Sequence, residues 1–339
     1  MINVHRATSH NLEEKRLKGE IKKRRAKRVL IQLPEGLKPE APRLASVAEK
    51  AGAVAIISAD PCYGACDLAL MEAQSLDVDL LIHYGHTPMT KQEYIPTMYI
   101  EGRAKAEVGE AVEKAIKHLK DWEVIGLVTT VQHIHKLDEA EDQLLRADKK
   151  VMVGDAGYVK YAGQIVGCDF SNAKCVSTDV DAFLFLGGGR FHAIGVALDT
   201  GKPTIIANPY EKRAFTIHDE AKTILMQRWA SICEAKEAER LAILIGLKSG
   251  QKRLGEALEL KERLEKIGKR TTILAIREIT PEALMQFPEI DAFINTACPR
   301  LSLHDARNFR KPVIALNEAR VLLEEITWEQ LCRRGWFES

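Results

Sequence analysis

Short apolar runs recur along the chain. Each run is continuously hydrophobic rather than alternating with polar residues, which is typical of parallel strands buried on both faces of a sheet. The pattern therefore predicts buried strands in three groups of four. The runs span residues 28–33, 53–58, 79–84 and 96–100; 124–130, 150–155, 182–187 and 203–208; and 241–247, 271–276, 292–297 and 312–317.

Several stretches between these runs are amphipathic and predict helices. They span residues 40–52, 107–122, 137–150 and 251–270, and a further helix-rich stretch covers 219–240. Alternation of strands and helices indicates βαβ units with right-handed crossovers. We therefore predict an α/β protein of three tandem, similar domains, each a four-stranded parallel sheet flanked by helices, with pseudo-threefold symmetry around a central site.

The predicted domains cover residues 1–121, 122–225 and 226–339. The chain's 339 residues suit two or three domains better than one ordinary core. A single large doubly wound domain is the alternative.

The charge balance and hydropathy of the chain argue against some classes of binding partner. The chain has 49 basic and 48 acidic residues, a balance that argues against a protein that coats nucleic acid or an anionic membrane. No apolar run approaches the roughly 20 residues that span a bilayer. The first twenty residues also lack the apolar segment of a secretory signal. We expect a cytoplasmic protein with no membrane partner and no direct nucleic-acid partner.

Unusual polar segments follow many of the predicted strands. In parallel sheets, ligands bind outside the carboxyl ends of the strands. Three such edges would meet in one composite site at the domain junction. The segments include PEGLK (34–38), GHTPM (85–89), QHIH (132–135), GGGRFH (187–192), KSGQKR (248–253) and CPR (298–300).

The chain has seven cysteines, an odd number that does not suggest a disulfide framework in a cytosolic protein. Each predicted domain offers a cysteine at the same end of its sheet. Cys62 and Cys66 share one loop, Cys168 follows a strand of the second domain, and Cys298 follows a strand of the third. Three converging thiolates suit an iron–sulfur cluster or zinc. The alternative is that they are buried apolar cysteines.

Two further features have both a functional and a structural interpretation. The turn GGGRF (187–191) could bring backbone N–H groups near an anion, although it could equally be a structural turn. Five histidines fall in the predicted edge loops, and each alone is more often a hydrogen-bonded structural residue than a catalyst. They are His83, His86, His133, His135 and His192.

Six segments in order resemble the archaeal 2-(3-amino-3-carboxypropyl)histidine synthase family, which performs the first step of diphthamide biosynthesis on elongation factor 2. The segments are IQLPEGL, DPCYGACDLA, HYGHTP, TTVQHIHKL, LGGGRFH and ACPRLS. The resemblance implies a homodimer of three-domain subunits with a 4Fe–4S cluster in each. By motif, it implies Cys66, Cys168 and Cys298 as the cluster ligands, with Cys62 as a neighbour.

The resemblance also implies an unusual radical cleavage of S-adenosylmethionine. A reduced cluster breaks the bond between the sulfur and the methionine γ-carbon, which gives 5′-methylthioadenosine and a 3-amino-3-carboxypropyl radical. The radical adds to C2 of a histidine imidazole on elongation factor 2. An electron donor is required, and no catalytic residue beyond the cluster is expected.

The sequence offers candidates for binding S-adenosylmethionine. Backbone N–H groups of Gly187, Gly188 and Gly189, with the charge of Arg190, could hold the cofactor's carboxylate. Candidates for contacts to the adenosine or amino group are His83, Gln132, His133 and His192.

Two rival functions remain at this point. Quinolinate synthase has a similar outline, with three α/β domains and three cysteines on a cluster that acts as a Lewis acid. A non-catalytic cluster-bearing partner subunit is the other possibility. The segments GGGRFH and ACPR favour the diphthamide family, and a full set of three candidate ligands argues against the partner subunit.

Overall fold

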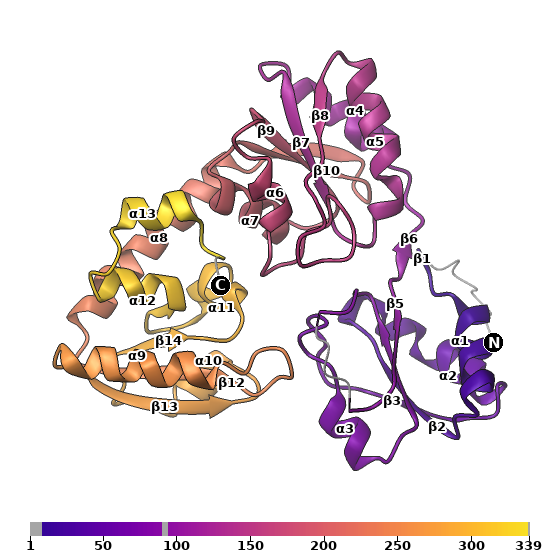
Figure 1. Ribbon diagram of the computed structural model, residues 1–339, viewed down its shortest axis with the longest axis horizontal. Coiled ribbons are helices and arrows are strands. Elements are labelled where there is room, and N and C mark those ends of the chain that lie inside the picture. Colours follow the sequence, from indigo (N-terminus) through magenta and orange to yellow (C-terminus); the bar gives the residue numbers. More distant parts are fainter. Residues whose placement is uncertain (1–8, 90–93, 338–339) are drawn as a thin grey trace.

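The computed structural model describes residues 9–89 and 94–337. The chain forms three lobes, each built on its own sheet, and the lobes surround a central region (Figure 1). The first sheet contains β2 (Arg28–Gln32), β3 (Val54–Ile57), β4 (Leu80–Tyr84) and β5 (Thr97–Ile100). The second contains β7 (Val124–Thr129), β8 (Lys150–Met152), β9 (Ala182–Leu186), β10 (Thr204–Asn208) and β11 (Arg213–Thr216). The third contains β12 (Arg240–Gly246), β13 (Arg270–Ile276), β14 (Ala292–Asn295) and β15 (Val313–Ala315).

The three sheets share one topology. Their orders are β3-β2-β4-β5, β8-β7-β9-β10-β11 and β13-β12-β14-β15, so the second strand of each unit lies outside the first. Strand pairs are parallel within each sheet except for β11, which pairs antiparallel with β10. All twelve predicted strands are present, which confirms the predicted α/β class and the repeated four-stranded unit.

One aspartate recurs at the same place in every unit. Asp79, Asp181 and Asp291 each precede the third strand, and each carboxylate accepts hydrogen bonds from two backbone N–H groups at the start of the first strand. The acceptor oxygen satisfies donors that the sheet leaves open at its amino end. The repeat of this contact supports a triplicated unit.

Helices cover the sheets on both faces. The first unit has α1 (Glu14–Arg24), η1 (Glu35–Glu40), α2 (Ala41–Glu49) and α3 (Leu70–Ser75). The second has α4 (Gly109–His118), η2 (Ile134–Lys136), α5 (Leu137–Arg146), α6 (Ser171–Cys175) and α7 (Phe191–Thr200). The third has α8 (His218–Glu237), α9 (Leu254–Lys266), α10 (Pro281–Leu284), α11 (Pro299–Leu303), η3 (Ala306–Asn308), α12 (Leu316–Leu322) and α13 (Trp328–Arg334).

The hydrophobic core is unevenly shared among the lobes. Side chains of the second and third units form one continuous cluster, to which α7, α8 and α13 contribute. The first sheet has separate clusters on its two faces. The second and third lobes are therefore joined by apolar packing, whereas the first lobe has its own core. None of the described helices is long and apolar enough to cross a membrane.

Besides the additional strand β11, the structure differs from the sequence expectations at three places. Helix α4 falls inside the predicted first domain, yet it packs against α5, β10 and β11 of the second unit. The boundary drawn between 225 and 226 cuts α8, because each unit begins with a helix before its first strand. Two short strands, β1 (His10–Asn11) and β6 (Arg103–Ala104), form a small extra sheet.

Candidate functional site

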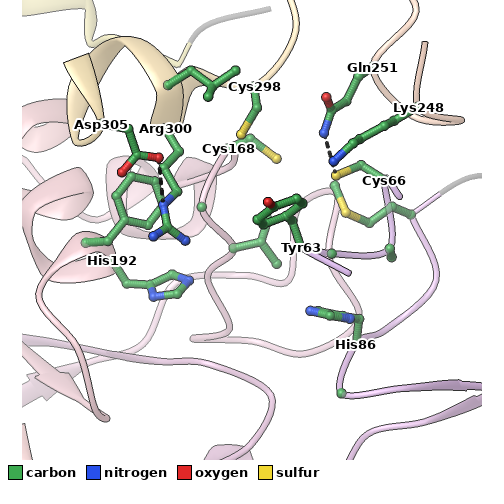
Figure 2. A pocket seen from close by; sticks show the side chains of 18 of the residues that line it. Tyr63, Cys66, His86, Cys168, His192, Lys248, Gln251, Cys298, Arg300 and Asp305 are labelled. Carbon is green, nitrogen blue, oxygen red and sulfur yellow. Dashed lines mark hydrogen bonds and ion pairs between the residues drawn. The ribbon is translucent and has the colours of Figure 1, made fainter. Parts of the chain in front are cut away.

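A cavity of about 370 Å³ lies where loops from all three sheets meet. Its walls include residues that follow the carboxyl ends of strands in every unit, as the predicted composite site requires. Cys66, Cys168 and Cys298 all line it (Figure 2). Cys66 follows β3, Cys168 follows β8, and Cys298 lies between β14 and α11.

The three thiols share one electrostatic environment. The pKa of Cys168 is raised to about 12, mainly by burial and in smaller part by negative charge on Cys66 and Cys298. Burial likewise raises the pKa of Cys298 to about 11, with an added contribution from Cys66. Burial also raises the pKa of Cys66. A bound metal would offset both effects, because a coordinating cation deprotonates a thiol outright.

The other cysteines lie outside the cavity wall. Cys62 is buried next to the cavity, but it is not among the lining residues. Cys175 and Cys233 are exposed, and Cys332 is partly buried near the carboxyl end of the chain. The three lining thiols therefore make one soft donor set, with one donor from each unit. This set would suit a 4Fe–4S cluster and would leave one iron without a protein thiolate.

A loop of the third unit holds Cys66 in place. The Gly250 N–H donates to the Cys66 carbonyl at 2.8 Å, and the Ser249 hydroxyl donates to the same oxygen at 3.3 Å. The Gln251 Nε2 donates to the Cys66 sulfur at 3.4 Å. Hydrogen bonds to cluster sulfurs are one way in which a protein tunes an iron–sulfur centre.

Lys248 forms a charged cluster at the junction of the first and third units. Its ammonium lies 3.1 Å from Asp67 and 2.8 Å from Glu278, and only 6% of the side chain is exposed. It also lies 4.0 Å from the ring centroid of Tyr63. These contacts combine two carboxylates and a cation–π interaction around one buried ammonium. Lys248, Glu278 and Tyr63 all line the cavity.

A second charged pair lines the cavity near α11. Arg300 lies 3.4 Å from Asp305 and stacks over the ring of Phe191 at 5.5 Å. His192 lies on the same side of the cavity (Figure 2). Burial lowers the pKa of His192 to about 4, and the charge of Arg300 contributes. His192 is therefore neutral at physiological pH.

The structure places two of the predicted cofactor contacts, Gln132 and His192, on the cavity wall. His83 and His133 are buried, but neither is among the lining residues. The ring of His83 forms a hydrogen bond with the ring of His86, and it is His86 rather than His83 that lines the cavity. The ring of His133 packs against Tyr210.

The glycine-rich turn does not face the cavity either. Gly187, Gly188, Gly189 and Arg190 are absent from the lining residues. The exposed Arg190 side chain pairs with Glu220 instead. Helix α7 begins directly after this turn, so Phe191 and His192 in its first turn reach the cavity.

The lining residues that the sequence did not single out as cofactor contacts include His86, Lys248, Gln251 and Arg300. All four fall in strand-following segments that the sequence had marked as unusual. The sequence therefore predicts the segments that surround the cavity, but it does not predict which side chains of those segments face into the cavity.

A sequence model of the family described as "Putative diphthamide synthesis protein" matches residues 33–332. The chain belongs to this family. The match spans every strand of the three sheets except β2, which ends one residue before it begins, and it includes all the residues that line the cavity.

Individual relatives agree with this assignment. The chain is 35% identical over 327 residues to 2-(3-amino-3-carboxypropyl)histidine synthase of Pyrococcus horikoshii, covering 95% of this chain and 94% of that protein. It is 30% identical over 333 residues to subunit 1 of the synthase of that name from Bos taurus, covering 95% of this chain and 74% of that one. These names describe transferases, and the predicted enzyme class is confirmed.

A solved structure supports the same conclusion. The crystal structure of Dph2 from Pyrococcus horikoshii with a 4Fe–4S cluster matches the fold with a TM-score of 0.86 at 34% identity. The match covers 94% of this chain and 92% of that one. The predicted family resemblance and the predicted fold are therefore confirmed.

Proposed function

We propose that this chain transfers the 3-amino-3-carboxypropyl group of S-adenosylmethionine to C2 of a histidine imidazole on elongation factor 2. The observation that carries the proposal is the convergence of Cys66, Cys168 and Cys298, one from each unit, on a single cavity. Similarity to a Dph2 structure that contains a 4Fe–4S cluster supports it.

Cys66, Cys168 and Cys298 would hold the cluster. When bound, a 4Fe–4S cluster supplies the electron that breaks the bond between sulfur and the methionine γ-carbon. The protein supplies binding, orientation and exclusion of water. Gln251 supports the Cys66 sulfur, and apolar side chains such as Val131 wall the cavity.

The cavity offers charged groups for the methionine end of S-adenosylmethionine. That end carries a carboxylate and an ammonium, so it needs one positive and one negative partner. Arg300 with Asp305 and Lys248 with Glu278 provide both, and all four residues line the cavity. We assign the carboxylate-binding role to Arg300 in place of Arg190, while Gln132 and His192 remain candidates for the adenosine.

Several finer parts of the function stay predictions. These are the homodimer, the electron donor, the cytoplasmic location and elongation factor 2 as the protein substrate. The names of the relatives imply a histidine acceptor, which agrees with the last of them.

An anaerobic assay tests the proposal. The chain is reconstituted with iron and sulfide, reduced with dithionite and given S-adenosylmethionine. We expect 5′-methylthioadenosine from the reduced, cluster-loaded protein alone. Release of 5′-deoxyadenosine would reject the proposed bond cleavage. Formation of quinolinate from its precursors would support the Lewis-acid alternative, and a loaded protein without turnover would support the non-catalytic partner.

Cysteine variants test the ligand assignment in the same preparation. Replacing Cys66, Cys168 or Cys298 with Ala should abolish the visible absorbance of the cluster and most bound iron, because each supplies one thiolate. Cys233→Ala is the matched control, since Cys233 is exposed on α8. If Cys62→Ala loses the cluster and Cys66→Ala keeps it, the assignment within that loop is wrong.

A further inference from the structure

A chain of three hydrogen-bonded side chains leads from the first sheet to the cavity wall. It consists of Gln32 at the end of β2, His83 in β4, and His86 in the loop that follows. Gln32 and His83 are paired across the parallel ladder of β2 and β4, which places their side chains side by side. The proposed function assigns no role to these three residues.

Backbone groups fix the orientation of the Gln32 amide. Its Nε2 donates to the Asp67 carbonyl at 2.6 Å, and its Oε1 accepts from the Ala69 N–H at 3.2 Å. A carbonyl can only accept and a backbone N–H can only donate, so the amide has one possible orientation. The oxygen therefore faces His83.

This orientation fixes the protons of both histidines. His83 Nδ1 lies 2.8 Å from Gln32 Oε1, so Nδ1 must carry the proton. Burial holds the pKa of His83 well below its usual value, so the ring is neutral and its Nε2 is an acceptor. His86 Nδ1 lies 2.9 Å from that Nε2 and must donate to it. The His86 ring also donates to the Tyr84 backbone. When Nδ1 carries the single proton of a neutral His86, Nε2 carries none.

The loop that carries His86 is held on both sides. Gln132 Nε2 donates to the Gly85 carbonyl at 2.6 Å, and Gln164 Nε2 donates to the Thr87 hydroxyl at 2.9 Å. Both glutamines belong to the second unit, so they hold the loop of the first unit across the domain junction. In Figure 2, His86 lies below Cys66 and away from Cys168 and Cys298.

A fixed, neutral acceptor suits a neutral N–H donor. The charged end of S-adenosylmethionine has better partners in Arg300 with Asp305 and in Lys248 with Glu278. An imidazole supplies a neutral ring N–H. Because C2 lies between the two ring nitrogens, holding one nitrogen limits the directions in which C2 can point.

From this arrangement, we infer that His86 binds the acceptor histidine, its Nε2 accepting the ring N–H of the imidazole to be modified. Gln32 and His83 are positioning residues that set the tautomer of His86. The inference rests on the proposed function and adds the residue that orients the protein substrate. It predicts that the acceptor imidazole enters with a proton on the nitrogen that faces His86.

The first test measures coupling. It compares the amount of group transferred to the acceptor protein with the amount of 5′-methylthioadenosine formed. His86→Phe should lower this ratio by about tenfold or more, as expected for loss of a hydrogen bond in a buried site. His135→Phe is the matched control, because His135 is an exposed histidine outside the cavity lining, and its ratio should stay at the wild-type value. An unchanged ratio in His86→Phe, or an equal loss of both products, would overturn the inference.

The second test does not depend on turnover or on a variant that folds. Long-range nitrogen–proton NMR of the full chain with labelled histidine, before and after cluster reconstitution, reports the tautomers directly. We expect protons on Nδ1 of both His83 and His86, and a shift of the His86 Nε2 signal when a histidine-containing peptide is added. A proton on His86 Nε2, or no shift with the peptide, would overturn the inference.

A metal analysis completes the design. Cys62, His83 and His86 place one ligand atom each within 4.8 Å of one another. Burial raises the pKa of Cys62 to about 12, so without a bound metal its thiol is protonated beside the histidine pair. One equivalent of a metal other than iron, lost in His86→Phe, would make this group a metal site and overturn the inference. If the wild type forms no 5′-methylthioadenosine, the proposed function fails, while the NMR result still decides the tautomer and the peptide contact.

Discussion

Gly250 shows how a single residue shapes the candidate cluster site. A Cβ added there would lie 2.7 Å from Cα and 2.8 Å from Cβ of Cys66, closer than real Cβ contacts allow. Gly250→Ala should displace the Cys66 backbone and lower cluster affinity by about tenfold or more, the scale seen when the support of a metal ligand is lost. Iron content and visible absorbance after reconstitution measure the effect.

Gly255→Ala is the control for this prediction. Gly255 lies in α9, and a Cβ there would meet nothing within 4 Å. The control should keep a full cluster and gain slightly in helix stability. Equal iron contents in the two variants would show that the contact with Gly250 does not position Cys66.

The sequence predicts the position of a site residue only where the order of strands and helices is enough to place it. The cysteines follow strands of three similar sheets, so their convergence on one edge could be expected. The histidine of the first unit that faces the cavity could not be predicted, because His83 and His86 lie three residues apart and only His86 lines the cavity. Arg190 and Arg300 are likewise both strand-following arginines, and long-range packing decides which one reaches the cavity.

At the scale of elements, a buried ion pair joins α8 to α12. Arg228 is 1% exposed and Glu318 is fully buried. Their side chains form two hydrogen bonds, at 2.7 Å and 2.6 Å. Glu318→Ala should destabilise the protein by about 3–5 kcal/mol, because the Arg228 charge would remain buried and unpaired. Urea unfolding measures the change.

The chain contains a matched exposed pair on the same helix. Lys236 of α8 pairs with Glu324 at 2.7 Å, but their side chains are 42% and 76% exposed. Lys236→Ala should therefore change the free energy of unfolding by less than about 1 kcal/mol. A double replacement, Arg228→Met with Glu318→Leu, should recover much of the stability lost in Glu318→Ala. A similar loss in Lys236→Ala and Glu318→Ala would contradict the argument from burial.

The elements could be predicted from sequence wherever apolar runs are long. All twelve predicted strands are present, but the prediction that each is buried on both faces is wrong for β3, β8 and β13, which lie at sheet edges and are only partly buried. The missed β11 is a short edge strand with a partly exposed pattern, paired to β10 by a hairpin. The placement of α4 was also missed, because sequence order does not say whether a helix packs on the sheet before it or after it.

At the scale of the whole molecule, the cavity lies at a polar junction. The first unit meets the others near the cavity through pairs such as Lys248 with Asp67 and through the glutamines that hold the loop of His86. The second and third units share one apolar cluster. The cavity therefore depends on directional contacts between lobes, and these contacts set the positions of its side chains.

Buried histidines make the stability of this junction depend on pH. Burial lowers the pKa of His86, His133 and His192 from 6.5 to about 4. Below pH 6.5 the unfolded chain takes up these protons, while the folded protein does not until near pH 4. Their contribution to stability is therefore fully present above pH 6.5 and is lost as the pH falls towards 4.

The expected loss is about 2 kcal/mol for each histidine at pH 5 and approaches about 3 kcal/mol below pH 4. Urea unfolding of the cluster-free protein at pH 7.5 and pH 5 measures it, and carboxylates contribute to the same slope. His192→Asn isolates one histidine, because asparagine does not titrate. The variant's deficit relative to the wild type should shrink as the pH falls, since only the wild type must keep His192 unprotonated. A deficit that stays constant between the two pH values would show that His192 protonates as easily in the folded protein as in the unfolded chain.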